Sequence, residues 1–153
     1  MSNESPVTDL SGDECWQLLE ASTLGRLAVL LDDGVDIFPV NFLVQDRVIF
    51  FASAPGSKLV DVARHPLVAF ESDGTTRGDR WSVVVRGRAT RLSIDADIVA
   101  SGVRMLHSLS PTQKWNYVRI LPATVSGRRF TAARRSHHAA SESVASRSWR
   151  SAG

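Results

Sequence analysis

The sequence predicts a mostly β fold with peripheral α-helices, most simply a small antiparallel barrel. The chain has 153 residues, of which 43% are hydrophobic and 22% charged, as expected of one compact domain. About six segments have the residue preferences of strands, and most of them follow one another directly. Helical segments do not alternate with these strands, which argues against the βαβ order of a dinucleotide-binding fold.

Composition and charge exclude several classes of protein. Cys15 is the single cysteine, so neither a disulfide framework nor a cysteine-rich zinc site can form, and the four histidines lack metal-binding spacing. No apolar stretch approaches the ~20 residues that span a bilayer, and the start does not resemble a signal peptide. We therefore expect a cytoplasmic protein with no metal and no membrane partner.

The basic residues are concentrated near the C-terminus. The net charge is +2, but arginines outnumber acidic residues mainly after Thr131. The rest of the chain is close to neutral, so we expect no nucleic-acid partner. We divide the chain into a flexible leader (residues 1–9), a folded domain (10–130) and a disordered basic tail (131–153).

The first predicted element is a helix that begins after Ser11 and continues to about Ala21. Ser11 and Glu14 have the spacing of a capping box. Cys15, Trp16, Leu18 and Leu19 then form one apolar stripe. We therefore expect Cys15 to be a core residue rather than a reactive thiol.

Three strands follow, over residues 24–31, 36–44 and 48–52, separated by turn signals. Both faces of the second strand are apolar apart from Asn41, so neither face is suited to water. A second sheet, a partner subunit or a flat aromatic ligand must cover the second face, or the strand is doubly buried in a barrel. Pro39 predicts an interruption of the hydrogen-bond ladder.

The remaining elements are two helices and further strands. Ser57 is the predicted N-cap of a short helix that ends near His65, and a second helix follows Asp95. We expect a strand over residues 67–70, a polar loop over 74–80, a long strand over 81–92, and a strand pair over 116–130. Gly87 within the long strand predicts a bulge or a bend.

The segment Pro55-Gly-Ser-Lys58 is the most suggestive local feature. A helix start with free N–H groups, a hydroxyl and an ammonium is suited to a phosphate, although the sequence is not a Walker loop. Gly-Ser is also common before any helix. No nucleophile motif and no paired carboxylates in an apolar setting occur. We expect no catalytic side chain, so the reactive group of an enzyme would come from a cofactor.

Five short motifs together resemble one known family. They are Leu24-Gly-Arg-Leu-Ala28, Pro39-Val-Asn-Phe42, Gly56-Ser-Lys58, Val68-Ala-Phe-Glu71 and Trp81-Ser-Val-Val-Val-Arg-Gly87. In this order the chain resembles the pyridoxamine 5'-phosphate oxidase-like family of flavin-binding split barrels, over about Leu10 to Phe130. It is most similar to the small actinobacterial-type branch, which includes proteins similar to nitroimidazole reductases.

The resemblance implies a six-stranded antiparallel split β-barrel that forms a homodimer and binds two FMN molecules at the subunit interface. It implies that Ser57 and Lys58 hold the FMN phosphate and that Ser53 closes over the ribityl phosphate. Trp81 and Ser82 match the segment that reaches the cofactor from the fifth strand, although Trp81 is equally suited to the core. The residues that match the strand lining the isoalloxazine ring are Pro39, Val40, Asn41 and Phe42.

The chain departs from the true oxidase in two places. Ser126-Gly-Arg-Arg-Phe130 is followed by a polar tail instead of the arginine and histidine cluster that binds pyridoxal phosphate, so vitamin B6 oxidation is not expected. The true oxidase also has an arginine between its phosphate-binding serine and lysine. Here Arg86 or Arg88 is a candidate to supply that charge.

The expected function is that of an FMN-dependent oxidoreductase. Hydride would pass from N5 of the reduced flavin to a small planar electrophile such as a nitroaromatic or quinone-like compound. One alternative is a reductase on the same fold that uses a deazaflavin coenzyme. Another is a non-catalytic protein that binds a flavin or haem. For haem, His65 or His107 would be the axial ligand.

Overall fold

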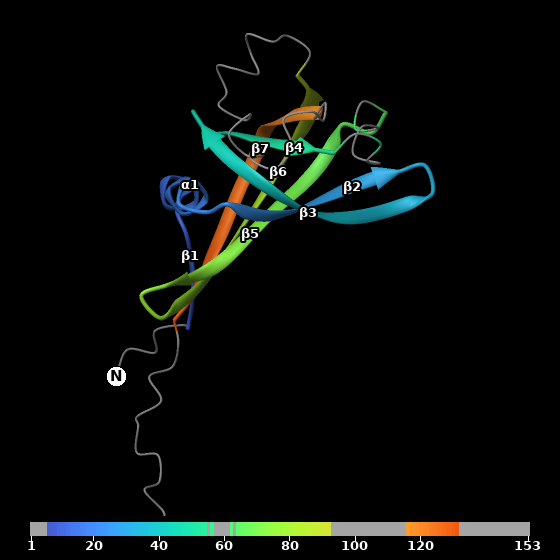
Figure 1. Ribbon diagram of the computed structural model, residues 1–153. Coiled ribbons are helices and arrows are strands. Elements are labelled where there is room, and N and C mark those ends of the chain that lie inside the picture. The colour runs from blue at the N-terminus through green and yellow to red at the C-terminus, as the bar shows by residue number, and fades with distance from the viewer. Residues whose placement is uncertain (1–5, 55, 57–61, 63, 93–115, 132–153) are drawn as a thin grey trace, which may run out of the picture.

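The described part of the chain folds into a closed antiparallel barrel. The computed structural model describes residues 6–54, 56, 62, 64–92 and 116–131. Its strands are β1 (Val7–Asp9), β2 (Leu24–Leu31), β3 (Gly34–Gln45), β4 (Val48–Ser53), β5 (Leu67–Thr76), β6 (Asp79–Arg91) and β7 (Asn116–Phe130). They pair in the order β1-β7-β4-β3-β2-β5-β6, and β6 also pairs with β7 (Figure 1). Strands β2 to β7 therefore form the six-stranded ring that was predicted.

The first three barrel strands match their predicted positions. β2, β3 and β4 are consecutive antiparallel neighbours, joined by short turns. Asp46 and Arg47 form the second turn with φ angles of 51° and 60°, and Gln45 pairs with Val48 across it. Positive φ at both central residues is the geometry that matches the twist of a two-residue hairpin.

Strands β5 and β6 are longer than predicted at their connection. The expected polar loop over residues 74–80 is wrong, because β5 continues to Thr76 and β6 begins at Asp79. Arg77 and Gly78 alone form the turn, with φ angles of 53° and 84°. The polar residues that suggested a loop lie on an extended hairpin whose end faces water.

Strand β7 is a single strand, whereas a strand pair was predicted over residues 116–130. Pro122 lies within this strand, opposite Gly87 at a shift in register between β6 and β7. Arg86 pairs with Thr124 and Gly87 with Pro122, so Ala123 is the extra residue of a bulge. The bulge predicted at Gly87 is therefore confirmed, and it lets one long strand pass the proline.

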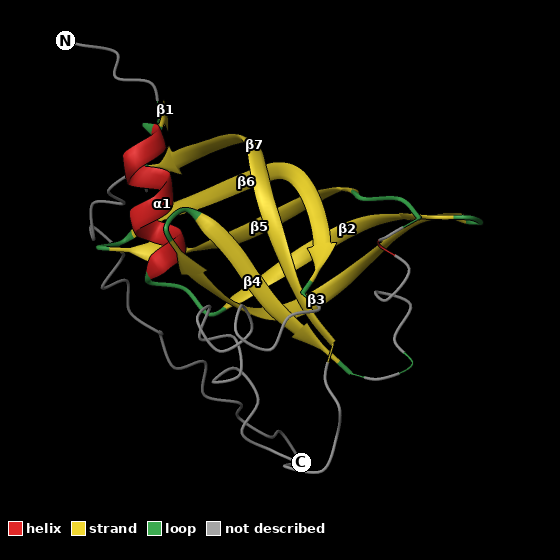
Figure 2. Cartoon of the chain, turned by 90° about the horizontal axis from the view of Figure 1, so that it is seen from above, coloured by secondary structure: helices red, strands yellow, loops and turns green. Residues whose placement is uncertain are grey.

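Helix α1 (Gly12–Glu20) contacts β7 and β3 and lies beside β1 (Figure 2). The predicted capping box is present: the Glu14 N–H donates to Ser11 Oγ at 3.2 Å. Cys15 is fully buried, and burial, together with the charge of Glu14, raises the pKa of its thiol. The core position predicted for Cys15 is confirmed.

The barrel interior contains the large apolar residues of alternating strand positions. The rings of Phe42 and Phe70 meet edge to face with their centroids 4.8 Å apart. Trp81, Val83, Val85 and Ala89 are all buried, as their alternation in β6 predicted. These strands and α1 share one continuous core.

The N-terminal boundary differs from the prediction. Val7–Asp9 was assigned to a flexible leader, but it forms β1 and pairs with Phe130, Arg129 and Arg128 of β7. The backbone supplies this pairing, so the polar side chains gave no signal of it. The helix predicted from Ser57 to about His65 lies mostly outside the described residues, and the helix predicted after Asp95 lies wholly outside them. The predicted tail over residues 131–153 also lies outside them apart from Thr131. Among the described residues, no helix is long and apolar enough to cross a membrane.

Candidate functional site

The two faces of β3 differ sharply around the motif Pro39-Val-Asn-Phe42. Val40 and Phe42 point into the core and are almost completely buried. Pro39 and Asn41 are exposed on the outer face of the barrel. The side chains of Pro39 and Asn41 are therefore accessible to a ligand, whereas Val40 and Phe42 can offer a ligand little beyond their backbone.

The backbone of β3 also has an open edge beside this motif. β4 pairs with β3 only from Phe42 onward, so residues 34–41 pair with β2 alone. The Phe42 N–H points toward β2 and donates to Thr23 O at 3.0 Å. The Ile37 N–H bonds no described strand and donates instead to the side chain of its neighbour, Asp36 Oδ1, at 2.8 Å. Because backbone directions alternate along a strand, the nitrogen of Pro39 and the N–H of Asn41 face the open edge.

Pro39 does not interrupt the ladder, which corrects the prediction. It is in register with Arg26, and the β2–β3 pairing is continuous from Gly34 to Asn41. A proline is tolerated here because its nitrogen faces the edge that has no strand partner among the described residues. The open edge is where the barrel is split, since β3 and β4 separate beyond Phe42 and Phe51.

Ser53 lies at the end of β4, on the other side of this split. It is 5% exposed, and its Oγ has no hydrogen-bond partner among the described residues. A buried hydroxyl without a partner costs free energy, so a ligand atom that reaches it would be favoured. Ser57 and Lys58, the predicted phosphate-binding residues, follow shortly in sequence but lie outside the described residues.

Two further polar residues at this end of the barrel were not predicted. Ser53 pairs with Asn116 of β7, and the Asn116 Oδ1 accepts a hydrogen bond from Arg91 at the end of β6. Ser53, Asn116 and Arg91 therefore form a polar group at one end of the barrel. Arg91 and Asn116 stand at strand ends, which is a signal that could have marked them as candidate site residues. The pairing of β7 with both β4 and β6, which brings them together, could not be read from the sequence.

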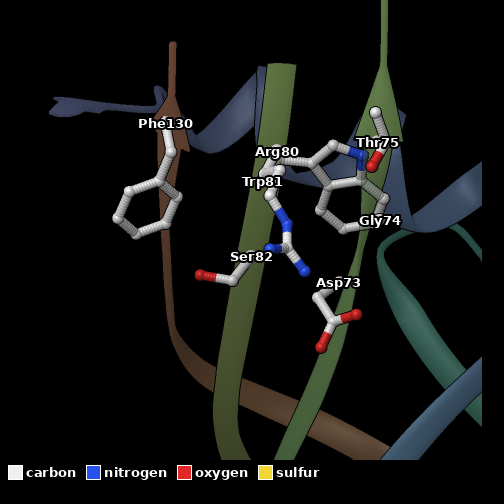
Figure 3. Close-up of a pocket in the computed structure, with 7 residues that line it drawn as sticks. All are labelled: Asp73, Gly74, Thr75, Arg80, Trp81, Ser82 and Phe130. Atoms are coloured by element: carbon white, nitrogen blue, oxygen red, sulfur yellow. The ribbon is translucent and has the colours of Figure 1, made fainter. Parts of the chain in front are cut away.

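The structure places Trp81 and Ser82 elsewhere on the barrel. Trp81 is 6% exposed and belongs to the core, and its Nε1–H donates to Thr76 Oγ1 at 3.2 Å. Ser82 points to the outer face, into a hollow of about 510 Å³ (Figure 3). Asn41 and Ser82 are separated by β2 and β5, or about 14 Å at ~4.8 Å per strand. One chain does not bring these two parts of the predicted site together.

Arg86 and Arg88, the candidates for an extra phosphate charge, line an apolar groove of about 550 Å³. Exposed Leu30, Val35, Leu67 and Leu121 form much of its wall. These two arginines lie on the exposed outer face of β6, three and five residues from Arg91. Arg91 instead donates a hydrogen bond to Asn116, the cross-strand partner of Ser53, and is therefore the best placed of the three.

The alternative ligand sets receive little support from the described residues. His65 Nε2 lies 2.9 Å from Asp32 Oδ1, and this contact, followed by the charge of Arg64, lowers the pKa of Asp32. That nitrogen is therefore occupied, and His107 lies outside the described residues. No group of three or more His, Cys, Asp or Glu side chains that could hold a metal occurs in the described ranges.

A six-stranded antiparallel ring split between β3 and β4 defines the split-barrel class of β proteins. The family described as pyridoxamine 5'-phosphate oxidase matches residues 11–129, and the chain belongs to this family. The relationship predicted from the five motifs is thus confirmed.

Individual relatives agree with this assignment. An uncharacterized protein of Mycobacterium tuberculosis is 35% identical over 88 residues, which are 58% of this chain and 80% of that protein. The FAD binding protein of Mycobacterium smegmatis is 39% identical with a TM-score of 0.71, and the match covers 82% of this chain and 100% of the other. An FAD-binding protein of Mesorhizobium loti is 27% identical with a TM-score of 0.65, covering 80% of this chain and 96% of the other.

Proposed function

We propose that this protein is a flavin-dependent oxidoreductase that uses FMN. When bound, the reduced flavin supplies hydride chemistry at N5 toward a small planar electrophile, such as a nitroaromatic or quinone-like compound. Pyridoxamine phosphate oxidation is not part of the proposal, because the resemblance to the family extends only to about Phe130 and does not include the segment that binds pyridoxal phosphate in the true oxidase. The protein contributes binding, orientation and electrostatics, since no side-chain base or nucleophile is required.

The observation that carries this proposal is the open edge of β3 beside the unpartnered hydroxyl of Ser53. Pro39 and Asn41 present an accessible, largely uncharged surface suited to a planar ring, and the free backbone edge offers polar groups to the ring's rim. Ser53 offers a hydrogen bond at the barrel end. Membership of the family and two FAD-binding relatives support a flavin as the group that fits.

The phosphate end of the flavin is assigned to the barrel end and the loop that follows β4. Ser53, Ser57 and Lys58 are the predicted contacts, and we add Arg91, which donates a hydrogen bond to Asn116, the cross-strand partner of Ser53. A guanidinium binds phosphate in a bidentate manner, so Arg91 compensates for the arginine missing between Ser57 and Lys58. The orienting role of Asn116 follows from its hydrogen bond with Arg91.

A homodimer is part of the proposal, with the cofactor at the interface. Val35 is 72% exposed and Leu67 is 68% exposed, and both line the apolar groove on the outer face. Val35 lies on the β2–β3 hairpin, which projects from the barrel (Figure 1). Exposed apolar surface of this kind is typical of interfaces.

The two buried serines provide a direct test of the cofactor site. Ser72 is also buried, but its Oγ–H donates to Leu24 O at 2.9 Å, unlike Ser53. Ser53→Ala should weaken flavin retention while leaving the stability of the flavin-free protein unchanged or slightly higher. Ser72→Ala should lower the free energy of unfolding by about 1 kcal/mol and leave flavin retention unchanged. Equal flavin retention in both variants would remove Ser53 from the site.

The cofactor itself is identified from the absorption spectrum and from mass spectrometry of the molecule released on denaturation. Release of FMN supports the proposal. Release of FAD or a deazaflavin would change the cofactor in the proposal but leave the proposed site as it is. The reduced protein should then transfer electrons to menadione or a nitroaromatic compound under anaerobic conditions. Bound flavin that stays reduced with every acceptor would identify a non-catalytic flavin-binding protein.

A further inference from the structure

We propose that the outer face of β5, β6 and β7 carries a nucleotide-binding groove, separate from the proposed flavin ring site on β3. Two hollows of about 510 Å³ and 550 Å³ adjoin there, and Ser82 and Phe130 line both. The first hollow is suited to a planar base and the second to a phosphate. The ligand class is a nucleoside monophosphate, free or as the adenylate end of a larger cofactor.

The first hollow combines an aromatic ring with hydrogen-bonding groups of both kinds. Phe130 is 41% exposed and is the direct cross-strand neighbour of Arg80. Figure 3 shows the Arg80 guanidinium between Ser82 and Asp73, while the indole of Trp81 turns to the other side of β6. A heterocyclic base could stack on the Phe130 ring and meet donors from Arg80 and acceptors from Asp73 along its edge.

A tryptophan packed against a glycine forms the floor of the first hollow. Trp81 and Gly74 are cross-strand partners, and a Cβ at Gly74 would lie 2.9 Å from Cζ2 of Trp81. The indole therefore fills the inner side of this pair and fixes the floor of the hollow. Asp73 Oδ2 accepts a hydrogen bond from Arg26 at 3.1 Å, and the carboxyl of Asp73 also interacts with Glu71.

The second hollow continues along the same strands and carries positive charge. Arg86 and Arg128 line it, together with Ser126 and Asp9. Arg128 Nε lies 4.0 Å from Asp9, whereas neither Arg80 nor Arg86 forms an ion pair with another described residue. Guanidinium groups and a serine hydroxyl are suited to phosphate oxygens. Ser82 lines both hollows and Arg86 only the second, about 13 Å further along the strand, so the two hollows follow one another along β6.

The test is calorimetric titration of the protein as purified with adenosine 5'-monophosphate, adenosine and inorganic phosphate. We expect the nucleotide to bind at least about tenfold more tightly than adenosine or phosphate alone, because it occupies both hollows. Phe130→Ala should weaken binding of the nucleotide and of adenosine roughly tenfold but leave phosphate binding unchanged. Arg86→Ala should weaken binding of the nucleotide and of phosphate but not of adenosine.

Matched controls lie on the same two strands. Leu121 is as exposed as Phe130, and Arg88 lies two residues from Arg86 but outside both hollows. Both control residues and Arg86 also line the apolar groove of the proposed dimer interface. Leu121→Ala and Arg88→Ala should bind the nucleotide like the unchanged protein, and thermal melting and sedimentation of all four variants verify that they fold and keep the same assembly. No nucleotide binding, or equal binding in Phe130→Ala, Arg86→Ala and their controls, would overturn the proposal.

Competition distinguishes the two sources of the nucleotide. If FAD displaces adenosine 5'-monophosphate and FMN does not, the groove holds the adenylate end of a dinucleotide flavin. If neither flavin displaces it, the groove binds a separate nucleotide. Retained flavin without nucleotide binding would refute this inference alone and leave the proposed flavin site intact.

Discussion

The inner and outer faces of the same barrel strands differ in burial and in the kind of side chain that they carry. Inside, residues such as Val83, Val85 and Ile120 are fully buried and form one continuous core. Outside, exposed Val35 and Leu67 lie near arginines and polar side chains. The inner face is explained by the folding of one chain alone. The exposed apolar residues of the outer face add nothing to this core and are suited to a binding partner. The functions proposed above therefore lie on the outer face.

The largest effect is expected where two backbones touch inside the barrel wall. A Cβ at Gly87 would lie 2.2 Å from Leu121 O at the bulge. Because a backbone carbonyl in a closed ring cannot move aside cheaply, Gly87→Ala should lower the free energy of unfolding by about 3 kcal/mol. Urea denaturation of the purified variant measures this loss.

Gly12 at the start of α1 is the matched control for this substitution. A Cβ there would have only Val125 Cγ1 nearby, at 4.0 Å. Gly12→Ala should therefore raise the free energy of unfolding by about 0.5 kcal/mol, since alanine restricts the unfolded chain more than glycine does. Equal stability of the two variants would show that the bulge relaxes around an added methyl group.

The sequence predicted the inner face well because alternation is a local signal. The positions of β2, β3 and β4, the capping box of α1 and the bulge at Gly87 all follow from neighbouring residues. The errors occurred where polar residues or a proline occupy extended backbone. The β5–β6 hairpin and the passage of β7 past Pro122 are held by pairing with distant strands, which no local pattern reports.

The candidate site was predictable only in part, for the same reason. Asn41 and Ser53 are positions that the family resemblance pointed out. In the structure the backbone of Asn41 faces an open edge, and the Ser53 hydroxyl has no partner among the described residues. Arg91 and Phe130 have no motif of their own. Their importance depends on strand pairing, because Arg91 meets Asn116 and Phe130 meets Arg80 only in the closed barrel.

The next largest effect is expected on the outer face of the barrel. Substitutions there should change the oligomeric state of the protein rather than its free energy of unfolding. Val35→Ser and Leu67→Ser together should convert a dimer into a monomer in sedimentation experiments at micromolar concentration, because both side chains line the apolar groove. Each exposed site should change the free energy of unfolding of the monomer by no more than about 0.5 kcal/mol. Val7→Ser, on exposed β1 outside the groove, should leave the dimer intact. A monomer before any substitution would remove the shared interface from the proposal.

The smallest expected effect is the pH dependence of stability that comes from two carboxyl groups near the surface, whose pKa values shift in opposite directions. Burial, followed by the hydrogen bond with Asp73, raises the pKa of Glu71 above 4.5, despite its 2.9 Å contact with Arg26. The hydrogen bond with His65 and the charge of Arg64 lower the pKa of Asp32 below 3.8. The folded state therefore holds the Glu71 proton more tightly than the unfolded state does, and the Asp32 proton less tightly.

The sign of each contribution to stability follows from these shifts. Glu71 makes the free energy of unfolding decrease as the pH rises from 4.5 through its folded pKa, whereas the contribution of Asp32 is present above pH 3.8 and is lost as the pH falls through its folded pKa. Urea denaturation between pH 3 and 7 should show that Glu71→Gln removes the first dependence and Asp32→Asn the second. Because both groups lie at the surface, each change should be small and should shrink further in high salt. A Glu71→Gln variant that loses stability equally at every pH in this range would mean that its hydrogen bond to Arg26, rather than its ionisation, is what matters on the outer face.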